Sequence, residues 1–256
     1  MIKAAFFDFD GTILSHTTGI ISESTKYALM QLRKKGIRIY LATGRHILAI
    51  QELMGNQITF DGYITLNGQL CLNKNKDVIF DFPIDEKDLN IMVSIFESKE
   101  IPIVFVEQRA MYINYINNDV VKTQKAISTP NPDVGKYSGE KVYQFIVYDD
   151  GKIVNKLMEK LPNCKMSRWN KYAVDIINQI GGKVTGIQYF LNSKGILPSE
   201  IVAFGDGEND IAMLDYAGIG IAMGNADKEV KEAADYVTTH IDDNGIINGL
   251  YYLGLI

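Results

Sequence analysis

Two short stretches decide the fold: Asp8-Phe9-Asp10-Gly11-Thr12 and, far along the chain, Gly205-Asp206-Gly207-Glu208-Asn209-Asp210. Each follows an apolar run, Ile2 to Phe7 in the first case and Ile201 to Phe204 in the second. Such runs predict strands that are buried on both faces, so the acids emerge where these strands end. Because strand side chains alternate, Asp8 and Asp10 share a face. Open α/β sheets bind ligands at this edge, and the pattern therefore predicts an acidic site there.

Strands and helices alternate outward from the first stretch. Ser22 or Ser24 can cap a helix that ends at Gly36, a strand follows over 37–42, and a helix follows over 46–54. Alternation with crossovers of this length predicts an α/β fold, a Rossmann-like parallel sheet with helices on both faces. The alternation resumes after Gly182, so we expect one core domain formed by residues 1–82 and 183–256.

The segment between these parts has a different pattern. From Phe82-Pro83 to Gly181-Gly182, paired strands joined by short turns alternate with helices, as in an antiparallel sheet. We therefore expect residues 83–182 to form an inserted α+β domain. Aromatic side chains on its strands could line a ligand site, although such residues more often pack in the core: Tyr112, Tyr115, Tyr143, Trp169 and Tyr172.

Composition narrows the function classes. The 256 residues are 46% hydrophobic with a net charge of −5, so the chain can bury a core but offers no general attraction to nucleic acid or acidic membranes. No apolar run reaches the length of a membrane span, and no signal-peptide pattern precedes the first strand. Cys71 and Cys164 fit a reducing compartment. We expect a cytoplasmic protein without nucleic-acid or membrane partners.

The acidic edge predicts a metal site. Asp8, Asp10, Asp206 and Asp210 would all lie at the carboxyl ends of strands in one sheet, where their charges repel. A solvated turn is the alternative for any one of them, since aspartate favours strand-to-loop junctions. Taken together, the four carboxylates favour a divalent cation, and their oxygen ligands favour Mg²⁺.

These acidic strand ends resemble the haloacid dehalogenase superfamily of phosphatases, and within it the Cof-type branch, over nearly the whole chain. The resemblance implies that Asp8 attacks phosphorus and that Asp10 protonates the leaving oxygen and then activates water. It implies that Asp8, the main-chain oxygen of Asp10 and Asp206 hold the metal, with Asp210 orienting this set. The inserted domain would be a C2-type cap over the cleft.

The same resemblance implies a phosphate-binding set of Thr43, Gly44, Lys183 and Asn209, with Thr43 and Lys183 also serving catalysis. From its type alone, Thr43 is an ordinary turn residue and Lys183 a solvated surface cation. Val184 follows Lys183 where the family commonly has glycine, which is a departure in the loop. Arg45 could face solvent or the cleft, and both readings stay open.

We therefore expect a Mg²⁺-dependent phosphatase that hydrolyses small phosphomonoesters through an aspartyl-phosphate on Asp8. Sugar phosphates, nucleotides and flavin mononucleotide are all compatible substrates, and the partner is a small phosphorylated metabolite. We expect a monomer or a weak homodimer. A phosphomutase that uses the same intermediate, or a non-catalytic sensor of phosphorylated ligands, are the alternatives.

Overall fold

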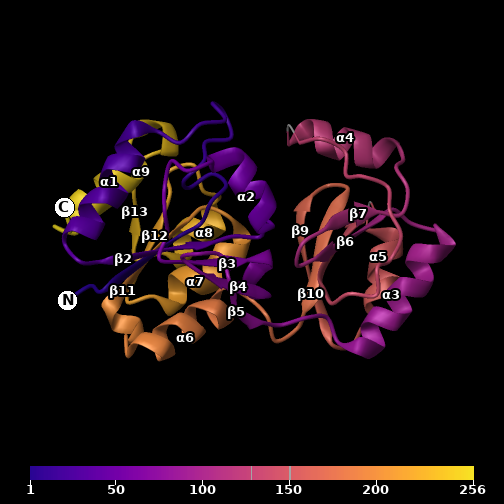
Figure 1. The fold of residues 1–256 in the computed structure, drawn as a ribbon. Coiled ribbons are helices and arrows are strands. Elements are labelled where there is room, and N and C mark those ends of the chain that lie inside the picture. Colours follow the sequence, from indigo (N-terminus) through magenta and orange to yellow (C-terminus); the bar gives the residue numbers. More distant parts are fainter. Residues whose placement is uncertain (128, 150) are drawn as a thin grey trace. The chain divides into compact units, whose positions relative to one another are not determined.

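A computed structural model describes residues 1–127, 129–149 and 151–256. The chain forms two compact units, one of Met1–Phe80 with Gly182–Ile256 and one of Asp81–Gly181 (Figure 1). The first unit is the core that carries the acidic stretches, and the second is inserted between its two parts. That the inserted unit serves as a cap stays a proposal.

The core unit is organised by one sheet with the order β13-β12-β11-β1-β2-β3-β4-β5. All its pairs from β13 to β3 are parallel, whereas β4 runs antiparallel to β3. The strands are β1 (Ala4–Phe7), β2 (Arg38–Ala42), β3 (Gly62–Thr65), β4 (Leu70–Asn73), β5 (Val78–Asp81), β11 (Ile201–Gly205), β12 (Ile219–Ala222) and β13 (Tyr236–Val237). The predicted parallel core is confirmed, and β1 lies at its centre between β2 and β11.

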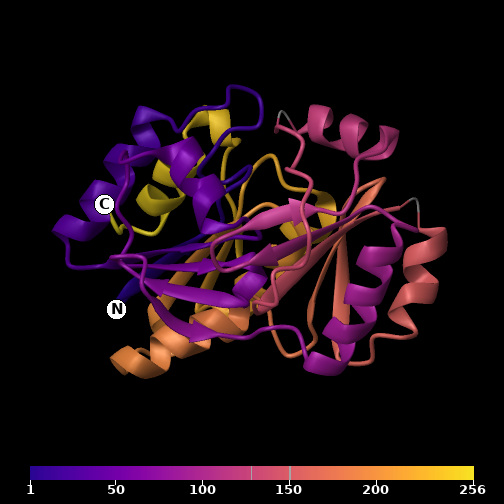
Figure 2. The ribbon, with the colours of Figure 1, turned by 45° about the vertical axis from the view of Figure 1, so that its right-hand side comes forward.

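Helices cover both faces of this sheet (Figures 1 and 2). They are α1 (Glu23–Lys34), α2 (Ile47–Met54), α6 (Lys183–Lys194), α7 (Ile211–Tyr216), α8 (Lys228–Ala233) and α9 (Gly245–Tyr252), with short 3-10 segments η1 (Leu66–Gly68), η2 (Pro198–Glu200), η3 (Glu208–Asp210) and η4 (Ile241–Asp243). Of the two predicted caps of α1, the structure uses Ser22, whose side chain accepts from the Thr25 amide at 3.1 Å. Helix α9, which packs against α1, was not predicted.

The core packs through strand alternation. Phe6 and Tyr40 stack on one face of the sheet with ring centroids 4.8 Å apart, and Phe190 of α6 packs against Tyr40 at the same distance. Phe7 and Phe204 stack with each other at 5.1 Å. All five rings are at most 3% exposed. Burial of aromatic area on adjacent parallel strands fixes their register, and with it the level at which the acidic stretches begin.

The inserted unit is an antiparallel sheet of order β7-β6-β8-β10-β9, as expected from the sequence. Its elements are α3 (Glu86–Ser98), β6 (Ile103–Glu107), β7 (Met111–Ile113), α4 (Asn118–Ala126), β8 (Val142–Tyr148), α5 (Lys152–Met158), β9 (Cys164–Asn170) and β10 (Ala173–Asn178). Met92 and Phe96 of α3 belong to the same core as Phe105 and Phe145 of the sheet. This unit therefore has a hydrophobic core of its own.

The aromatic residues that could have lined a site in this unit differ in how far their side chains are buried. Tyr112 and Tyr143 are buried, and their hydroxyls donate to Glu107 and to Asp81 respectively. Trp169 is 39% exposed, and its indole donates to Asp175 at 2.8 Å. The first two are thus structural residues of the unit, in agreement with the more common role of aromatics on antiparallel strands.

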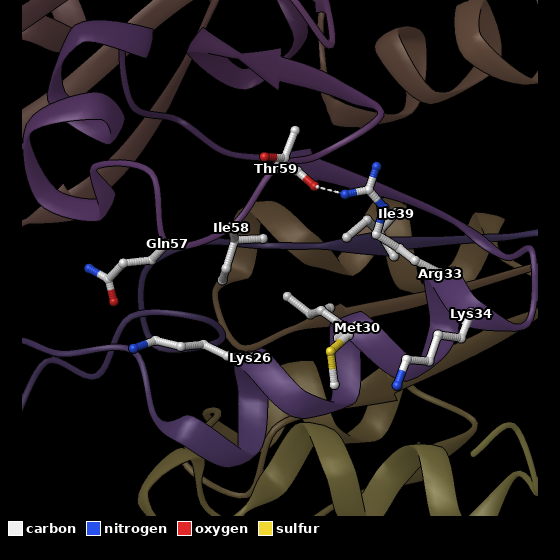
Figure 3. A pocket seen from close by; sticks show the side chains of 9 residues that line it. Lys26, Met30, Arg33, Lys34, Ile39, Gln57, Ile58 and Thr59 are labelled. Carbon is white, nitrogen blue, oxygen red and sulfur yellow. Dashed lines mark hydrogen bonds between the residues drawn. The ribbon is translucent and has the colours of Figure 1, made fainter.

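A hollow of about 410 Å³ lies beside α1 in the core unit (Figure 3). Basic residues line it, but Arg33 donates to the Thr59 carbonyl at 3.0 Å and Lys26 contacts Glu23 at 2.6 Å. The hollow shares no residue with the acidic stretches.

Among the helices of the described residues, none is both long enough and apolar enough to cross a membrane.

Candidate active site

The acidic stretches begin at the same level of the sheet. Phe7, the last residue of β1, is in register with Leu41 of β2 and with Phe204 of β11. The Asp8 amide continues this ladder by donating to the Phe204 carbonyl at 2.9 Å. Because the three strands are parallel, the residues that follow them lie at one edge. Asp8, Thr43 and Asp206 therefore come from neighbouring strand ends.

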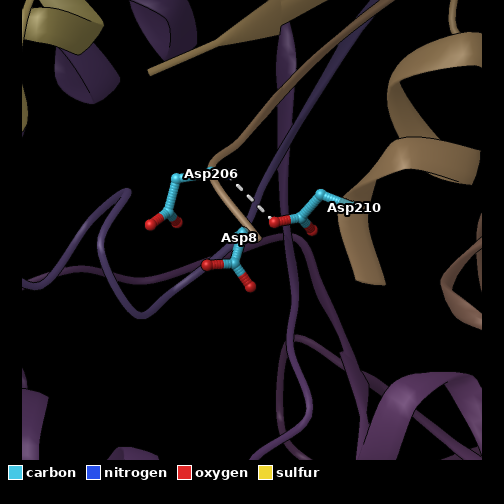
Figure 4. A group of neighbouring side chains, drawn as sticks. All are labelled: Asp8, Asp206 and Asp210. Carbon is cyan, nitrogen blue, oxygen red and sulfur yellow. Dashed lines mark hydrogen bonds between the residues drawn. The ribbon is translucent and has the colours of Figure 1, made fainter. Parts of the chain in front are cut away.

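Three carboxylates form a cluster at this edge (Figure 4). Asp8, Asp206 and Asp210 each offer a carboxylate oxygen, and these oxygens all lie within 4.8 Å of one another. Asp8 and Asp210 are buried, and Asp206 is partly buried. The structure thus brings together three of the four predicted carboxylate side chains. The side chain of the fourth, Asp10, is engaged elsewhere.

Asp206 is held in place from two directions. Thr12 donates its hydroxyl proton to Oδ1 at 3.0 Å, and Asn225 donates from Nδ2 to Oδ2 at 3.2 Å. Gly11, whose φ is +77°, passes so close that a Cβ there would lie 2.0 Å from Asp206 Oδ2. The glycine of the first stretch therefore serves both a left-handed turn and a close approach to the second stretch.

Asp210 accepts hydrogen bonds from the groups around it and so holds the cluster in place. Its Oδ2 accepts from the amides of Asp206 and Gly207 at 3.1 and 3.0 Å, which fixes the turn that carries Asp206. Its Oδ1 accepts from Lys183 Nζ at 2.6 Å. Both oxygens are thus occupied by protein donors, an arrangement suited to orienting the neighbouring groups.

Lys183 is buried, unlike an ordinary surface lysine, with its side chain 1% exposed. Its Nζ donates to Asp8 Oδ1 and to Asp210 Oδ1, each at 2.6 Å. It is the first residue of α6. The capping residue Gly182 has φ 151° and ψ 158°, a conformation that only glycine adopts readily.

Burial and mutual repulsion perturb the charges of this cluster. Burial, followed by the nearby Asp210, raises the pKa of Asp8 well above its ordinary value. The same two causes raise the pKa of Asp206 to about 7. Burial by itself would lower the pKa of Lys183, but Asp210 and Asp8 outweigh it, so this pKa is raised. Lys183 carries one positive charge, which is less than the negative charge that the ionised carboxylates of the cluster would carry.

Asp10 lies beside Arg45 rather than in the cluster. Arg45 donates from Nε to Asp10 Oδ2 at 2.6 Å and from a terminal nitrogen to Oδ1 at 2.8 Å. This two-point contact fixes the plane of the carboxylate. Arg45, for which the sequence left solvent and the cleft open, is thus paired with Asp10, and its side chain is 23% exposed.

The predicted phosphate-binding residues lie around the same edge. Thr43 is buried, and its hydroxyl oxygen accepts from the Arg45 amide at 3.1 Å. Asn209 is exposed and donates from Nδ2 to Asn67 Oδ1 at 3.0 Å. Gly44 packs against the same asparagine, since a Cβ there would lie 3.1 Å from Asn67 Nδ2. The first stretch, the Thr43 turn and the second stretch thus form one connected network.

Sequence reasoning missed three members of this network. Thr12 is the last residue of the first acidic stretch but was assigned no role, and neither Asn67 nor Asn225 was assigned to the site. Asn225 also donates to the Gly11 carbonyl at 2.8 Å, so its contacts span most of the chain. No local sequence pattern predicts such a contact. A polar residue soon after an apolar strand at this edge indicates only in general that it could belong to the site.

A parallel sheet that gathers buried carboxylates and a buried lysine at its carboxyl edge defines an α/β enzyme with an acidic site. The family model for haloacid dehalogenase-like hydrolases matches residues 5–250. The chain therefore belongs to the haloacid dehalogenase-like hydrolase family.

Relatives and solved structures agree with this membership. The Bacillus subtilis protein named "Putative phosphatase YkrA" is 29% identical over 257 residues, which cover 99% of this chain and 98% of that protein. BT1666 of Bacteroides thetaiotaomicron, described among phosphatases of this superfamily, has a TM-score of 0.91 and 31% identity, covering 100% of this chain and 96% of that one.

The subclass IIB sugar phosphatase BT4131 has a TM-score of 0.87 and 35% identity over 99% of this chain and 100% of that one. Together, the family match and these neighbours support a hydrolase that acts on phosphate esters.

Proposed function

We propose that this protein is a Mg²⁺-dependent phosphatase that hydrolyses small phosphomonoesters through an aspartyl-phosphate on Asp8. The observation that carries the proposal is the position of Asp8: it follows the central strand, contacts the buried Lys183 at 2.6 Å and adjoins two further carboxylates. A nucleophilic carboxylate needs such surroundings, because it must approach an anionic phosphoryl group.

The residues of the cluster fit a divalent cation. Lys183 contacts two of the three clustered carboxylates, and its one positive charge cannot balance all three, so burial makes the remaining charge costly. The donor set consists of carboxylate oxygens, which suits Mg²⁺. Asp8, the main-chain oxygen of Asp10 and Asp206 would hold the ion, while Asp210 orients this set. When bound, the ion would offset the repulsion between the carboxylate and the phosphate.

The chemistry follows in two displacements. Asp8 attacks phosphorus through a carboxylate oxygen, the bond to the leaving oxygen breaks, and Asp10 gives that oxygen a proton. Asp10 then takes a proton from water, the water oxygen attacks phosphorus, and the bond to Asp8 breaks to release phosphate. One acid can serve both steps because its proton is lost in the first and recovered in the second. In the structure, Arg45 orients the Asp10 carboxylate through two hydrogen bonds.

The phosphate itself would be bound by Thr43, Gly44, Lys183 and Asn209. The Thr43 oxygen already accepts from the Arg45 amide, which leaves its proton to donate to a phosphate oxygen. Lys183 contributes a compact charge that also suits the pentavalent transition state. Such a set would combine a neutral donor, a buried cation and an exposed amide.

The proposed substrate class is a small phosphorylated metabolite. BT4131 is described as a sugar phosphatase, which supports a phosphorylated small metabolite such as a sugar phosphate or a nucleotide. The inserted unit would act as the cap that selects the leaving group. We place the protein in the cytoplasm, in keeping with its two buried free thiols, Cys71 and Cys164. We expect a monomer or a weak homodimer.

Release of phosphate from p-nitrophenyl phosphate, measured with Mg²⁺ and again after EDTA, tests the proposal. We expect metal-dependent turnover in the wild type and its loss in Asp8→Asn, with the fold retained. Asp77→Asn, which changes an exposed aspartate of the same unit, is the matched control. Turnover that survives in Asp8→Asn would remove Asp8 as nucleophile. No hydrolysis across a panel of phosphometabolites would favour a mutase or a sensor.

A further inference from the structure

The short segment Leu66–Gly68, which forms η1, adopts an unusual backbone at the edge of the sheet. Leu66, Asn67 and Gly68 have φ values of 53°, 53° and 87°, and all three are buried. Left-handed conformations are disfavoured for leucine and tolerated by asparagine and glycine. Consecutive left-handed residues persist only where their surroundings determine them, and such places are often functional.

Three separate parts of the proposed phosphate site rest on this segment. Its backbone binds the Thr43 turn, since the Asn67 amide donates to the Thr43 carbonyl at 3.0 Å and the Leu66 amide to the Arg45 carbonyl at 3.2 Å. Gly68 packs directly on the residue before Lys183, because a Cβ on Gly68 would lie 1.9 Å from the Gly182 oxygen. A third contact, with Asn209, is made by the Asn67 side chain.

The side chain of the buried residue Asn67 accepts a hydrogen bond from an exposed residue, Asn209. Asn67 is 6% exposed, whereas Asn209 is exposed and donates from Nδ2 to Asn67 Oδ1 at 3.0 Å. A free surface amide samples several rotamers and loses that freedom when it binds a ligand. An acceptor that holds it beforehand removes this cost and improves affinity.

We propose that Asn67 is a positioning residue that pre-orients Asn209 for the phosphate of the substrate. This inference rests on the proposed function, in which Asn209 is a phosphate ligand. Asn67 acts through Asn209 and has no chemical step of its own. Its removal should therefore weaken phosphate binding while leaving the contacts of Asp8, Asp10 and Lys183 intact.

The competing explanation is that Asn67 is present only because asparagine tolerates this backbone. Asn67→Gly separates the two, because glycine keeps the left-handed conformation and the backbone amide while removing the side-chain acceptor. Asn244→Gly is the matched control. Asn244 has φ 60° and ψ 31°, close to the 53° and 38° of Asn67, but it is exposed and lies in another turn of the same unit.

The experiment measures binding of inorganic phosphate by calorimetry in the presence of Mg²⁺, together with kcat and KM for p-nitrophenyl phosphate. For Asn67→Gly we expect phosphate affinity to fall by roughly threefold to tenfold, the cost of ordering one side chain, with KM rising in parallel and kcat within about twofold. Asn244→Gly should match the wild type in all three quantities.

A double-mutant cycle with Asn209→Ala decides whether Asn67 acts through Asn209. Once Asn209 is truncated, Asn67→Gly should change phosphate affinity no further. Effects that multiply independently, or an unchanged affinity in Asn67→Gly, would overturn the proposal, as would a wild type that binds no phosphate. A wild type that binds phosphate but hydrolyses no ester would instead overturn the proposed function and leave this comparison standing.

Discussion

Lys183 and Asp8 form a buried ion pair of 2.6 Å between residues 175 positions apart in the sequence. The lysine is the first residue of α6 and the aspartate directly follows β1, so the contact joins the two parts of the core unit that flank the insertion. Asp210 shares the same lysine. A pair so fully desolvated is costly to break, because the remaining partner stays buried without its counter-charge.

Lys183→Met should therefore reduce both stability and activity. The variant leaves Asp8 and Asp210 buried without their cation, and we expect a loss of about 3–5 kcal/mol in the free energy of unfolding. Urea denaturation measures this loss. Lys194→Met, at the exposed last turn of the same helix, should stay within about 0.5 kcal/mol of the wild type. Equal stabilities of the two variants would contradict a structural role for the Lys183 pair.

Arg45→Lys tests the orientation of Asp10. Lysine keeps the charge but cannot make the two-point contact, so the Asp10 carboxylate should lose its fixed plane. Since acid–base catalysis contributes about 10²–10⁴ in rate, we expect a fall in kcat of roughly tenfold or more with a smaller change in KM. Steady-state kinetics with p-nitrophenyl phosphate give both constants.

Arg33→Lys is the control for this substitution, because Arg33 also contacts an aspartate, Asp61 at 3.4 Å, without touching the site. Its kinetics should equal those of the wild type. If Arg45→Lys turned over substrate as fast as Arg33→Lys, Asp10 would not depend on the guanidinium for its position.

Gly11→Ala tests the close approach of the two acidic stretches. The new Cβ would meet Asp206 Oδ2 at 2.0 Å on a backbone with φ +77°, so the variant should lose Mg²⁺-dependent activity and more than about 2 kcal/mol of stability. Gly19→Ala has a similar φ of +67° and nothing within 4 Å of the added atom. It carries the backbone penalty alone, about 1 kcal/mol, and should keep full activity. Comparable losses in the two variants would refute the steric explanation.

Much of the fold could be predicted because local patterns coincide with the final structure. The apolar runs before Asp8 and Asp206 became central strands, and the antiparallel character of the insertion follows from its short turns. Elements whose hydrophobic patterns are weak were not predicted. Strand β5 is only partly buried, so its few apolar residues before Pro83 gave no clear period, and α9 lies in a glycine-containing tail segment.

The site was predictable where a strand end fixes a residue and unpredictable where a side chain reaches across the fold. Asp8 and Asp206 follow adjacent strands, and the structure brings their carboxylates together as the parallel register requires. The contacts of Asp10 with Arg45 and of Asn209 with Asn67 depend on rotamers and loop paths that no spacing encodes. The same holds for the burial of Lys183, which composition alone would place at the surface.

The stabilisation of the folded protein by Mg²⁺ should depend on pH, and the raised pKa values of the carboxylates determine its direction. Without metal, the pKa values of Asp8 and of Asp206 (about 7) lie above the ordinary 3.8. Because of Asp206, the folded protein binds more protons than the unfolded chain between about pH 4 and 7, and its stability falls as pH rises, by at most about 1.4 kcal/mol per pH unit for this group. The raised pKa of Asp8 acts in the same direction. Mg²⁺ replaces those protons, so its stabilising effect should be larger at pH 7.5 than at pH 5.

Thermal unfolding with and without Mg²⁺ at the two pH values measures this difference, with NaCl at matched ionic strength as the salt control. Asp206→Asn removes one of the titrating carboxylates from the cluster, so both the metal-induced rise in Tm and its pH dependence should shrink. A rise of equal size at both pH values, or one that persists in full in Asp206→Asn, would show that Mg²⁺ acts somewhere other than the cluster of Asp8, Asp206 and Asp210.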